Sequence, residues 1–155
     1  MSHKQPTLYI VVPCYNEEAV LAETAKQLSA KLQELVQKKQ IHSDSKIMFV
    51  NDGSKDQTWS KICDLHKKNS DIVGISLSRN RGHQNALLAG LMTAKTRADS
   101  VISMDADLQD DINVIDQMLE KYQDDAEIVY GVRSSRQKDS WFKRFTAESF
   151  YKFMK

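Results

Sequence analysis

Short apolar runs alternate with longer amphipathic segments along most of this chain. The runs cover residues 8–12, 47–50, 72–77 and 101–104 and are rich in β-branched residues, as buried strands are. Between them, apolar residues recur at steps of three and four, which is the spacing of one helix face. Strands that alternate with helices predict right-handed crossovers and an α/β fold with an open, mainly parallel sheet covered by helices on both faces.

Several boundaries follow from the same pattern. Pro13 ends the first apolar run, so we expect the first strand to stop there. The helix expected over residues 86–94 is rich in small residues, which predicts that it is well buried. Apolar positions over residues 115–122 predict a further helix, and residues 128–130 predict a fifth strand.

Composition narrows the class of protein without identifying it. The chain has 155 residues and a formal net charge of +1, so it fits about one domain and gives no electrostatic case for nucleic acid. Two cysteines, Cys14 and Cys63, are too few for a disulfide framework, which favours a reducing, cytoplasmic setting. No apolar run reaches the roughly 20 residues of a membrane span. We expect a main domain over residues 1–140, followed by an aromatic and basic helix over residues 141–155.

Polar clusters follow each expected strand. A single cluster of this kind is compatible with an ordinary polar loop. However, the carboxyl ends of parallel strands meet at one edge of a sheet, where open α/β folds bind their ligands. The coincidence of five clusters therefore favours a binding site, and the clusters lie at residues 15–18, 51–54, 79–83, 105–111 and 133–136.

Asp105 and Asp107 stand one residue apart just after the fourth run. In an extended chain, side chains at i and i+2 point to the same side, so the two carboxylates converge if the extended geometry persists. Converging carboxylates repel unless a cation lies between them, and oxygen ligands select hard divalent cations such as Mg²⁺ or Mn²⁺. Because Mg²⁺ commonly combines one or two carboxylates with phosphate oxygens, the pair suits a bound diphosphate.

Other residues of this edge suit the remainder of a nucleotide. Glu17 and Asp52 can accept hydrogen bonds from ribose hydroxyls or base N–H groups. Arg79 and Arg133 can each donate two hydrogen bonds to a phosphate. The glycine-rich dinucleotide fingerprint and the Gly-x4-Gly-Lys phosphate loop are both absent, which argues against an ordinary NAD site and an ATPase.

Four motifs in series, together with a fifth segment after them, resemble family 2 glycosyltransferases of the GT-A fold. The branch that the chain resembles contains dolichol-phosphate mannosyltransferases and bacterial polyprenyl-phosphate glycosyltransferases, and the resemblance begins near Thr7. The segments that carry it are Pro13-Cys-Tyr-Asn-Glu17, Asn51-Asp-Gly-Ser54, Ser78-Arg-Asn-Arg-Gly-His83, Asp105-Ala-Asp-Leu-Gln109 and Gly131-Val-Arg133-Ser-Ser-Arg136.

The resemblance implies an inverting transfer of a sugar from a nucleotide-diphosphate sugar, such as UDP-glucose, to a polyprenyl phosphate, with Mg²⁺ or Mn²⁺. It assigns Asp105, Ala106 and Asp107 to the diphosphate and the reacting centre, with Asp107 and Gln109 as metal ligands and Asp105 bridging metal and sugar. It assigns Arg133 to a phosphate. The nucleoside would contact Pro13, Tyr15, Glu17, Val50 and Asp52.

Some features depart from the family pattern or lie outside it. Arg81 stands where relatives usually carry an aromatic residue, and Ile112-Asn113 stands where a proline is usual, which puts loop shape in question. His83 could touch a ligand, although a histidine at a helix start more often caps or packs. Cys14 has no adjacent base in the sequence to activate it as a nucleophile.

Family members normally continue well beyond this length, many of them into membrane helices, so we expect the chain to be the donor-binding part of a longer protein. That protein would act at the cytoplasmic face of the cell membrane. Residues 141–155 could lie on the membrane surface or pack on the missing part, and exposed aromatic residues there could drive self-association. Two alternatives remain open: a nucleotide-sugar-binding fragment or subunit without activity, and a nucleotidyltransferase. The absent phosphate loop argues against the latter.

Overall fold

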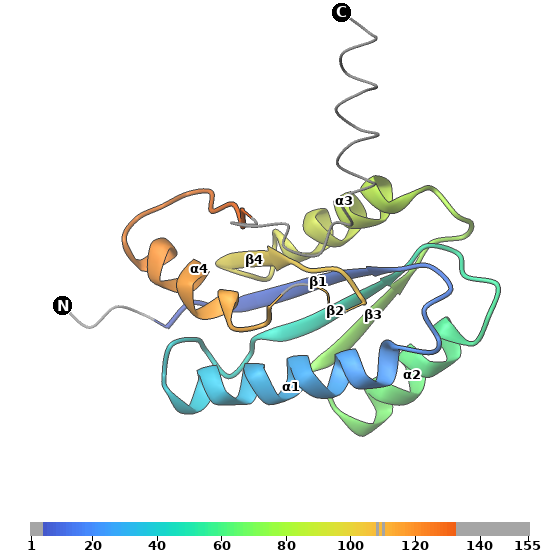
Figure 1. Cartoon of the computed structure of the whole chain (residues 1–155), viewed down its shortest axis with the longest axis horizontal. Coiled ribbons are helices and arrows are strands. Elements are labelled where there is room, and N and C mark those ends of the chain that lie inside the picture. The colour runs from blue at the N-terminus through green and yellow to red at the C-terminus, as the bar shows by residue number, and fades with distance from the viewer. Residues whose placement is uncertain (1–4, 108, 110, 133–155) are drawn as a thin grey trace, which may run out of the picture. The chain divides into compact units, whose positions relative to one another are not determined.

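Four parallel strands form one sheet in the order β3-β2-β1-β4 (Figure 1). The computed structural model describes residues 5–107, 109 and 111–132. The strands are β1 (Leu8–Cys14), β2 (Lys46–Asn51), β3 (Ile72–Ser76) and β4 (Ser100–Ser103). The helices are α1 (Leu21–Gln37), α2 (Thr58–Lys68), α3 (His83–Ala94) and α4 (Val114–Gln123). The sheet and the first three helices belong to a unit that ends at Glu120, and residues 121–155 form a second unit.

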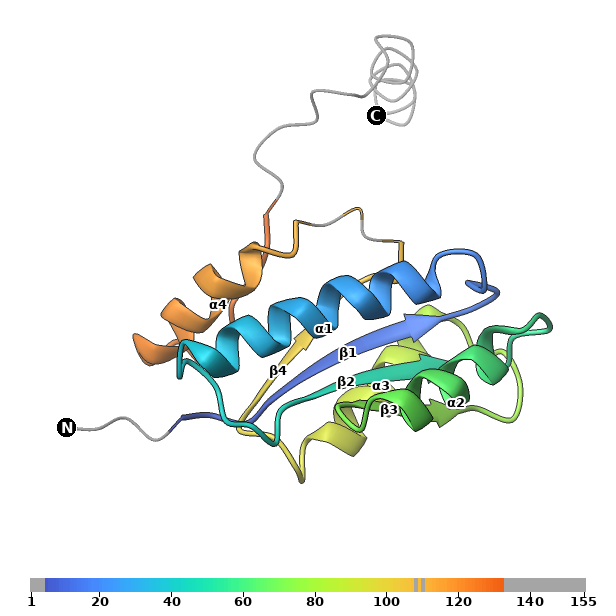
Figure 2. The ribbon, with the colours of Figure 1, turned by 90° about the horizontal axis from the view of Figure 1, so that it is seen from below.

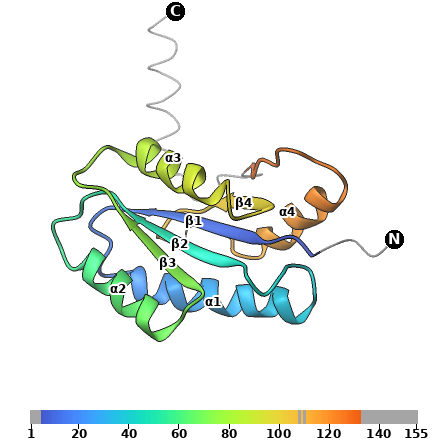
Figure 3. The same ribbon diagram turned by 180° about the vertical axis from the view of Figure 1, so that it is seen from behind.

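Strand β1 is buried along its whole length because both faces of the sheet are covered. Leu8, Ile10 and Val12 point into a core shared with α1, whereas Tyr9 and Val11 point into a second core beneath α3. Figures 2 and 3 show α1 and α2 on one face of the sheet and α3 on the other. This arrangement confirms the predicted parallel sheet with helices on both faces.

The strand order reverses beside β1. From β1 the chain moves outward through β2 to β3, crosses the other face through α3, and returns to place β4 on the opposite side of β1. The carboxyl ends of β1 and β4 therefore lie side by side, and the loops that follow them begin next to each other. In open α/β sheets this topological switch point is where ligands bind.

The prediction that β1 stops at Pro13 was wrong, because β1 runs to Cys14. The carbonyl of Val11 accepts a hydrogen bond from Met104, so the backbone of alternate residues, including Pro13, faces β4. Pairing between the two strands ends at Val11 and Ser103. The N–H that proline lacks would therefore point past the end of β4, so its absence removes no hydrogen bond of the sheet.

Helix α3 is buried on one side only, which corrects the prediction that it is well buried. Ala86, Gly90 and Ala94 face the sheet. Leu88 and Met92 point outward, with 54% and 59% of their surface exposed. The small residues thus serve close packing on one face rather than burial of the whole helix.

The predicted fifth strand is also not formed. Residues 128–130 are described and have no strand structure. Helix α4 is formed as expected. The segment 141–155 lies outside the described residues. None of the helices within the described part of the chain combines the length and apolar character that crossing a membrane requires.

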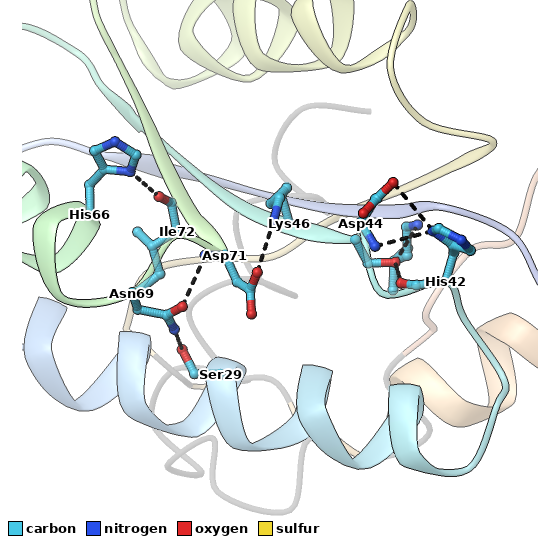
Figure 4. A network of polar contacts seen from close by, with 10 residues as sticks. Ser29, His42, Asp44, Lys46, His66, Asn69, Asp71 and Ile72 are labelled. Atoms are coloured by element: carbon cyan, nitrogen blue, oxygen red, sulfur yellow. Dashed lines mark hydrogen bonds and ion pairs between the residues drawn. The ribbon is translucent and has the colours of Figure 1, made fainter.

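Polar contacts hold the amino edge of the sheet, opposite the predicted site (Figure 4). Lys46 at the start of β2 pairs with Asp71 at 2.8 Å. Asn69 accepts a hydrogen bond from the Asp71 backbone N–H and donates one to Ser29 on α1. His66 Nδ1 lies 2.6 Å from the carbonyl oxygen of Ile72. These contacts fix the turn before β3.

Candidate active site

The loops at the carboxyl ends of β1 to β4 carry four of the five predicted polar clusters. The fifth cluster, with Arg133, lies outside the described residues. The site residues of the four described clusters come from the loops after β1, β2, β3 and β4, and the parallel sheet brings these loops to one edge. The positions of the four clusters follow the prediction from the apolar pattern.

Hydrogen bonds join the loops that follow β1 and β2. The backbone N–H of Glu17 donates to the buried hydroxyl of Thr58 at 2.9 Å, and that of Asn16 donates to Ser54 Oγ at 3.0 Å. Asn16 has a positive φ of 57°, a conformation that asparagine tolerates better than most residues. Glu17 is therefore held by α2 as well as by its own strand.

Asp52 is the most deeply buried acid of the edge, with 2% of its surface exposed. Its Oδ1 accepts a hydrogen bond from the Arg81 N–H at 2.7 Å, and its Oδ2 accepts one from the Gly82 N–H at 2.9 Å. Both carboxylate oxygens thus hold the loop that leads into α3. Each oxygen can accept a further hydrogen bond, so this role leaves a nucleoside contact open.

The loop after β2 approaches the loop before α3 so closely that only glycine fits. A Cβ on Gly53 would lie 2.4 Å from the carbonyl carbon of Arg79 and 2.5 Å from the backbone nitrogen of Asn80. Gly53 also has a φ of +64°, which disfavours other residues. This contact places Arg79 beside the Asp52 loop.

Asp105 and Asp107 lie beyond the end of β4, which stops at Ser103. Strand alternation alone therefore does not bring them together, because the backbone turns at Ala106. Met104 and Ala106 are buried against the α1 core, while both aspartates are exposed. Core packing of the residues beside them is what turns the two carboxylates outward.

The two aspartates face different neighbours. His83, at the start of α3, places its Nε2 3.9 Å from Asp105 Oδ1. Asp107 Oδ1 accepts a hydrogen bond from the Gln109 N–H at 3.1 Å. Partial burial, and next the negative charge of the nearby Asp107, raise the pKa of Glu17. Acids from the β1 and β4 loops thus meet at the switch point.

Cys14 lies under this edge and is unsuited to nucleophilic chemistry. Burial, together with the nearby charge of Glu17, raises the pKa of its thiol to about 12. The thiol donates a hydrogen bond to the carbonyl oxygen of Val12. A nucleophilic cysteine must be a thiolate, so the structure agrees with the expectation that Cys14 is not activated as a nucleophile.

The other residues assigned to the nucleoside differ in access. Tyr15 is exposed beside Glu17, whereas Pro13 and Val50 are buried in the sheet. The Val50 side chain packs in the core beneath α3, close to Gly90. Any contact of Val50 with a ligand would therefore come from its backbone.

Exposed carboxylate oxygens are ligands that suit Mg²⁺ or Mn²⁺. Among the described residues, no three histidine, cysteine, aspartate or glutamate side chains are arranged to enclose a metal ion. Two carboxylates nevertheless fit a cation that takes its other ligands from phosphate and water. Asp105 and Asp107 would hold such an ion, with Gln109 next to them.

Two residues of the site have roles that the sequence did not predict. His83 is the first residue of α3, and the N-cap position belongs to Gly82. The side chain of His83 does not pack in the core but faces Asp105. Thr24 on α1 is fully buried and donates a hydrogen bond to the carbonyl oxygen of Ala106 at 2.6 Å. A polar residue on the apolar face of α1, between Leu21 and Leu28, was the available signal for Thr24.

Comparison with known proteins gives matches across most of the chain. The model of the glycosyl transferase family 2 matches residues 9–155. The uncharacterised glycosyltransferase YkoT of Bacillus subtilis (strain 168) is 54% identical over 154 residues, which are 99% of this chain and 46% of YkoT. The bactoprenol glucosyl transferase of Shigella phage SfV is 43% identical over 143 residues, which are 92% of this chain and 44% of the phage protein. The chain thus spans less than half the length of both relatives.

Solved structures with low sequence identity share the fold. The mannosyltransferase PcManGT from Pyrobaculum calidifontis, in complex with GDP-Man and Mn²⁺, has a TM-score of 0.55 at 23% identity over 68% of this chain and 28% of its own. The S. aureus protein TarS has a TM-score of 0.56 at 19% identity over 86% of this chain and 40% of its own. The family match, the two sequence relatives and the shared GT-A fold together show that the chain belongs to glycosyltransferase family 2.

Proposed function

We propose that this chain is the donor-binding part of an inverting glycosyltransferase that moves a sugar from a nucleotide-diphosphate sugar to a polyprenyl phosphate. The observation that carries the proposal is the meeting of acids from different loops at the switch point beside β1. The negative charge of Asp107 acts on Glu17 there, and Asp105 faces His83. The name of the phage relative, a bactoprenol glucosyl transferase, favours a polyprenyl acceptor and a glucosyl donor such as UDP-glucose.

The parts of the donor are assigned by the chemistry of each loop. Glu17 and Asp52 accept hydrogen bonds from the ribose or the base, and exposed Tyr15 lies beside them. Arg79 and Arg133 bind phosphate oxygens through their guanidinium groups. Asp105 and Asp107 hold a divalent cation, which when bound neutralises negative charge on the leaving diphosphate. PcManGT, whose structure contains GDP-Man and Mn²⁺, suggests that this fold accommodates such a pair, although at 23% identity it shows the fold alone.

The reaction needs little proton transfer. An oxygen of the acceptor phosphate attacks the anomeric carbon while the bond from that carbon to the diphosphate oxygen breaks, which inverts the configuration. A phosphate monoester with a second pKa near about 6 is already ionised at neutral pH, so a strong general base is unnecessary. The residues of the site then contribute mainly by holding the two reactants in line. A lipid-linked acceptor would place the reaction at the cytoplasmic face of the membrane.

Product analysis tests the proposal directly. Incubation with labelled UDP-glucose, Mn²⁺ and a short polyprenyl phosphate should give the glucosylated lipid phosphate and UDP. A panel of UDP- and GDP-sugars in thermal-shift assays would identify the preferred donor, because a ligand that binds only the folded state raises the melting temperature. Release of pyrophosphate from a nucleoside triphosphate would contradict the proposal and indicate a nucleotidyltransferase.

A binding role without turnover is the second candidate. The described residues of the site are all assigned to the donor and its cation, and a protein that only binds the donor would need the same residues. In that case UDP-glucose would bind in the presence of Mn²⁺ and no lipid product would form. Adding the separately produced remainder of a relative such as YkoT, outside the region that this chain matches, should then restore transfer if the chain acts as one part of a composite enzyme.

A further inference from the structure

Two hydrogen bonds fix the backbone on either side of Asp105. The N–H of Met104 donates to the carbonyl oxygen of Val11 in the neighbouring strand at 3.0 Å. The carbonyl oxygen of Ala106 accepts the hydrogen bond from Thr24 Oγ1 at 2.6 Å. The residue between these anchors, Asp105, is exposed at the site.

The hydrogen bond from Thr24 also controls Asp107. A peptide unit is planar, so the direction of the Ala106 carbonyl sets the plane that contains the nitrogen and Cα of Asp107. Ala106 is itself buried in the α1 core, which keeps water from replacing the threonine hydroxyl. The exit direction of the Asp107 side chain therefore depends on Thr24, a helix residue 82 positions before Ala106.

Thr24 is not required for local helix structure. Its hydroxyl also lies 3.1 Å from the carbonyl oxygen of Val20, four residues earlier, a contact that helical threonines make routinely. A hydroxyl has one hydrogen, and the shorter contact is the one to Ala106. On α3, Thr93 donates to the carbonyl oxygen of Ala89 and makes no other side-chain hydrogen bond with the described residues. Thr93 is therefore a natural control for what the local contact contributes.

We propose that Thr24 is a positioning residue that holds residues 105–107 in the conformation that binds the metal–diphosphate end of the donor. This inference rests on the proposed function for the identity of the ligand. Thr24 touches neither the donor nor the cation. It acts through the peptide unit between Ala106 and Asp107.

The test compares three variants of the whole chain: Thr24→Val, Thr24→Ser and Thr93→Val. Valine keeps the volume of threonine but cannot donate, whereas serine keeps the hydroxyl. We measure UDP affinity by calorimetry with Mn²⁺ and with EDTA, and free Mn²⁺ by its paramagnetic resonance signal. Thr24→Val should remove most of the gain in affinity that Mn²⁺ provides, because loss of a partner behind the metal ligands usually weakens metal binding by about 10- to 100-fold. Affinity in EDTA should change little, and Thr24→Ser and Thr93→Val should resemble the unmodified chain.

Amide hydrogen exchange without ligand separates failure of this inference from failure of the proposed function. Thr24→Val should speed exchange at residues 105–109 and leave the N–H of Glu17 and that of Gly82 unchanged. If the unmodified chain shows no Mn²⁺-dependent UDP binding, the proposed function fails, and exchange still reports whether Thr24 orders the segment. The inference is overturned if Thr24→Val keeps the Mn²⁺-dependent gain, if serine loses it equally, or if exchange at residues 105–109 is unaffected.

Discussion

Asp52 has a structural task that extends beyond the nucleoside contact implied by its motif. Its two oxygens accept the N–H groups of Arg81 and Gly82, so it joins the end of β2 to the entrance of α3. Hydrogen bonds to a charged acceptor contribute about 1.5–3 kcal/mol each. A loop that carries two arginines is thereby fixed from below by one buried carboxylate.

Asp52→Asn tests this task. The amide has one oxygen to accept a hydrogen bond, and its NH₂ group would face the second backbone N–H. We expect a lower melting temperature and faster tryptic cleavage after Arg79 and Arg81. Asp99→Asn is the matched control, because Asp99 accepts a single backbone N–H, from Thr7, which an asparagine oxygen can replace. Equal cleavage of the two variants would contradict the role of Asp52.

Glu17 makes stability depend on pH. Partial burial and the charge of Asp107 raise its pKa, so the folded chain holds a proton at Glu17 more readily than the unfolded chain does. Stability should therefore fall as pH rises from the ordinary glutamate pKa, about 4.3, through the raised value, and the penalty should persist at higher pH.

Glu17→Gln removes this penalty. In metal-free buffer we expect the variant to melt at a higher temperature than the unmodified chain at pH 7.5 and at about the same temperature at pH 4. Glu120→Gln, at an exposed position on α4, should show no such pH-dependent gain. If the melting temperatures of Glu17→Gln and the unmodified chain run in parallel over the whole pH range, the pKa of Glu17 is not raised by folding.

At the scale of elements, α3 determines how the sheet face that it covers is packed and where His83 lies. The helix approaches the sheet through Gly90, where a Cβ would lie 2.4 Å from Val11 Cγ1 and 2.9 Å from Val50 Cγ2. Both neighbours are β-branched and stiff, so they cannot easily yield. This close approach fixes the distance between α3 and strands β1 and β2.

Gly90→Ala should therefore destabilise the chain by about 1–3 kcal/mol, even though alanine favours helices over glycine by about 1 kcal/mol. Leu88→Ala, on the exposed side of the same helix, should change stability by less than about 0.5 kcal/mol. Urea unfolding measures both values. A stabilised Gly90→Ala variant, or a large loss in Leu88→Ala, would mean that α3 faces the sheet differently.

The elements that could be predicted from the sequence are those whose burial follows a period. Strands β1 to β4 and helices α1 and α4 show a strong pattern of apolar residues, so the sequence predicted that these elements exist. It also predicted that the loops after the strands share one edge of the sheet. The end of β1 could not be predicted, because whether Pro13 is tolerated in the strand depends on where β4 stops. The exposure of the outer side of α3 could not be predicted either, because the small residues of its buried face give no clear apolar pattern. Residues 128–130 have strand-like composition, and composition alone does not provide a pairing partner.

The sheet edge that carries the candidate site was predictable from the sequence, whereas the geometry of its loops was less so. Acids after parallel strands meet at one edge whatever the details of the loops, which is why Glu17, Asp52, Asp105 and Asp107 could be selected. The contacts that orient them depend on pairs far apart in sequence, such as Thr24 with the Ala106 carbonyl. No local pattern specifies a contact of that kind.

At the scale of the whole molecule, the sheet gathers one functional surface from loops that are scattered along the chain. The order β3-β2-β1-β4 puts the loops of β1 and β2, which we propose contact the nucleoside, on one side of the switch point and the acidic loop of β4 on the other. A donor that spans both sides would bind most tightly when a divalent cation joins its diphosphate to the β4 loop. This linkage is the central claim.

Calorimetric titration of UDP-glucose into the chain with Mn²⁺ and with EDTA measures that linkage most directly. We predict at least about tenfold tighter binding with Mn²⁺, equivalent to about 1.4 kcal/mol, and loss of this difference in Asp107→Asn with the EDTA affinity retained. Affinity that is the same with Mn²⁺ and with EDTA, or an Asp107→Asn variant that keeps the difference, would contradict a metal–diphosphate site at this edge of the sheet.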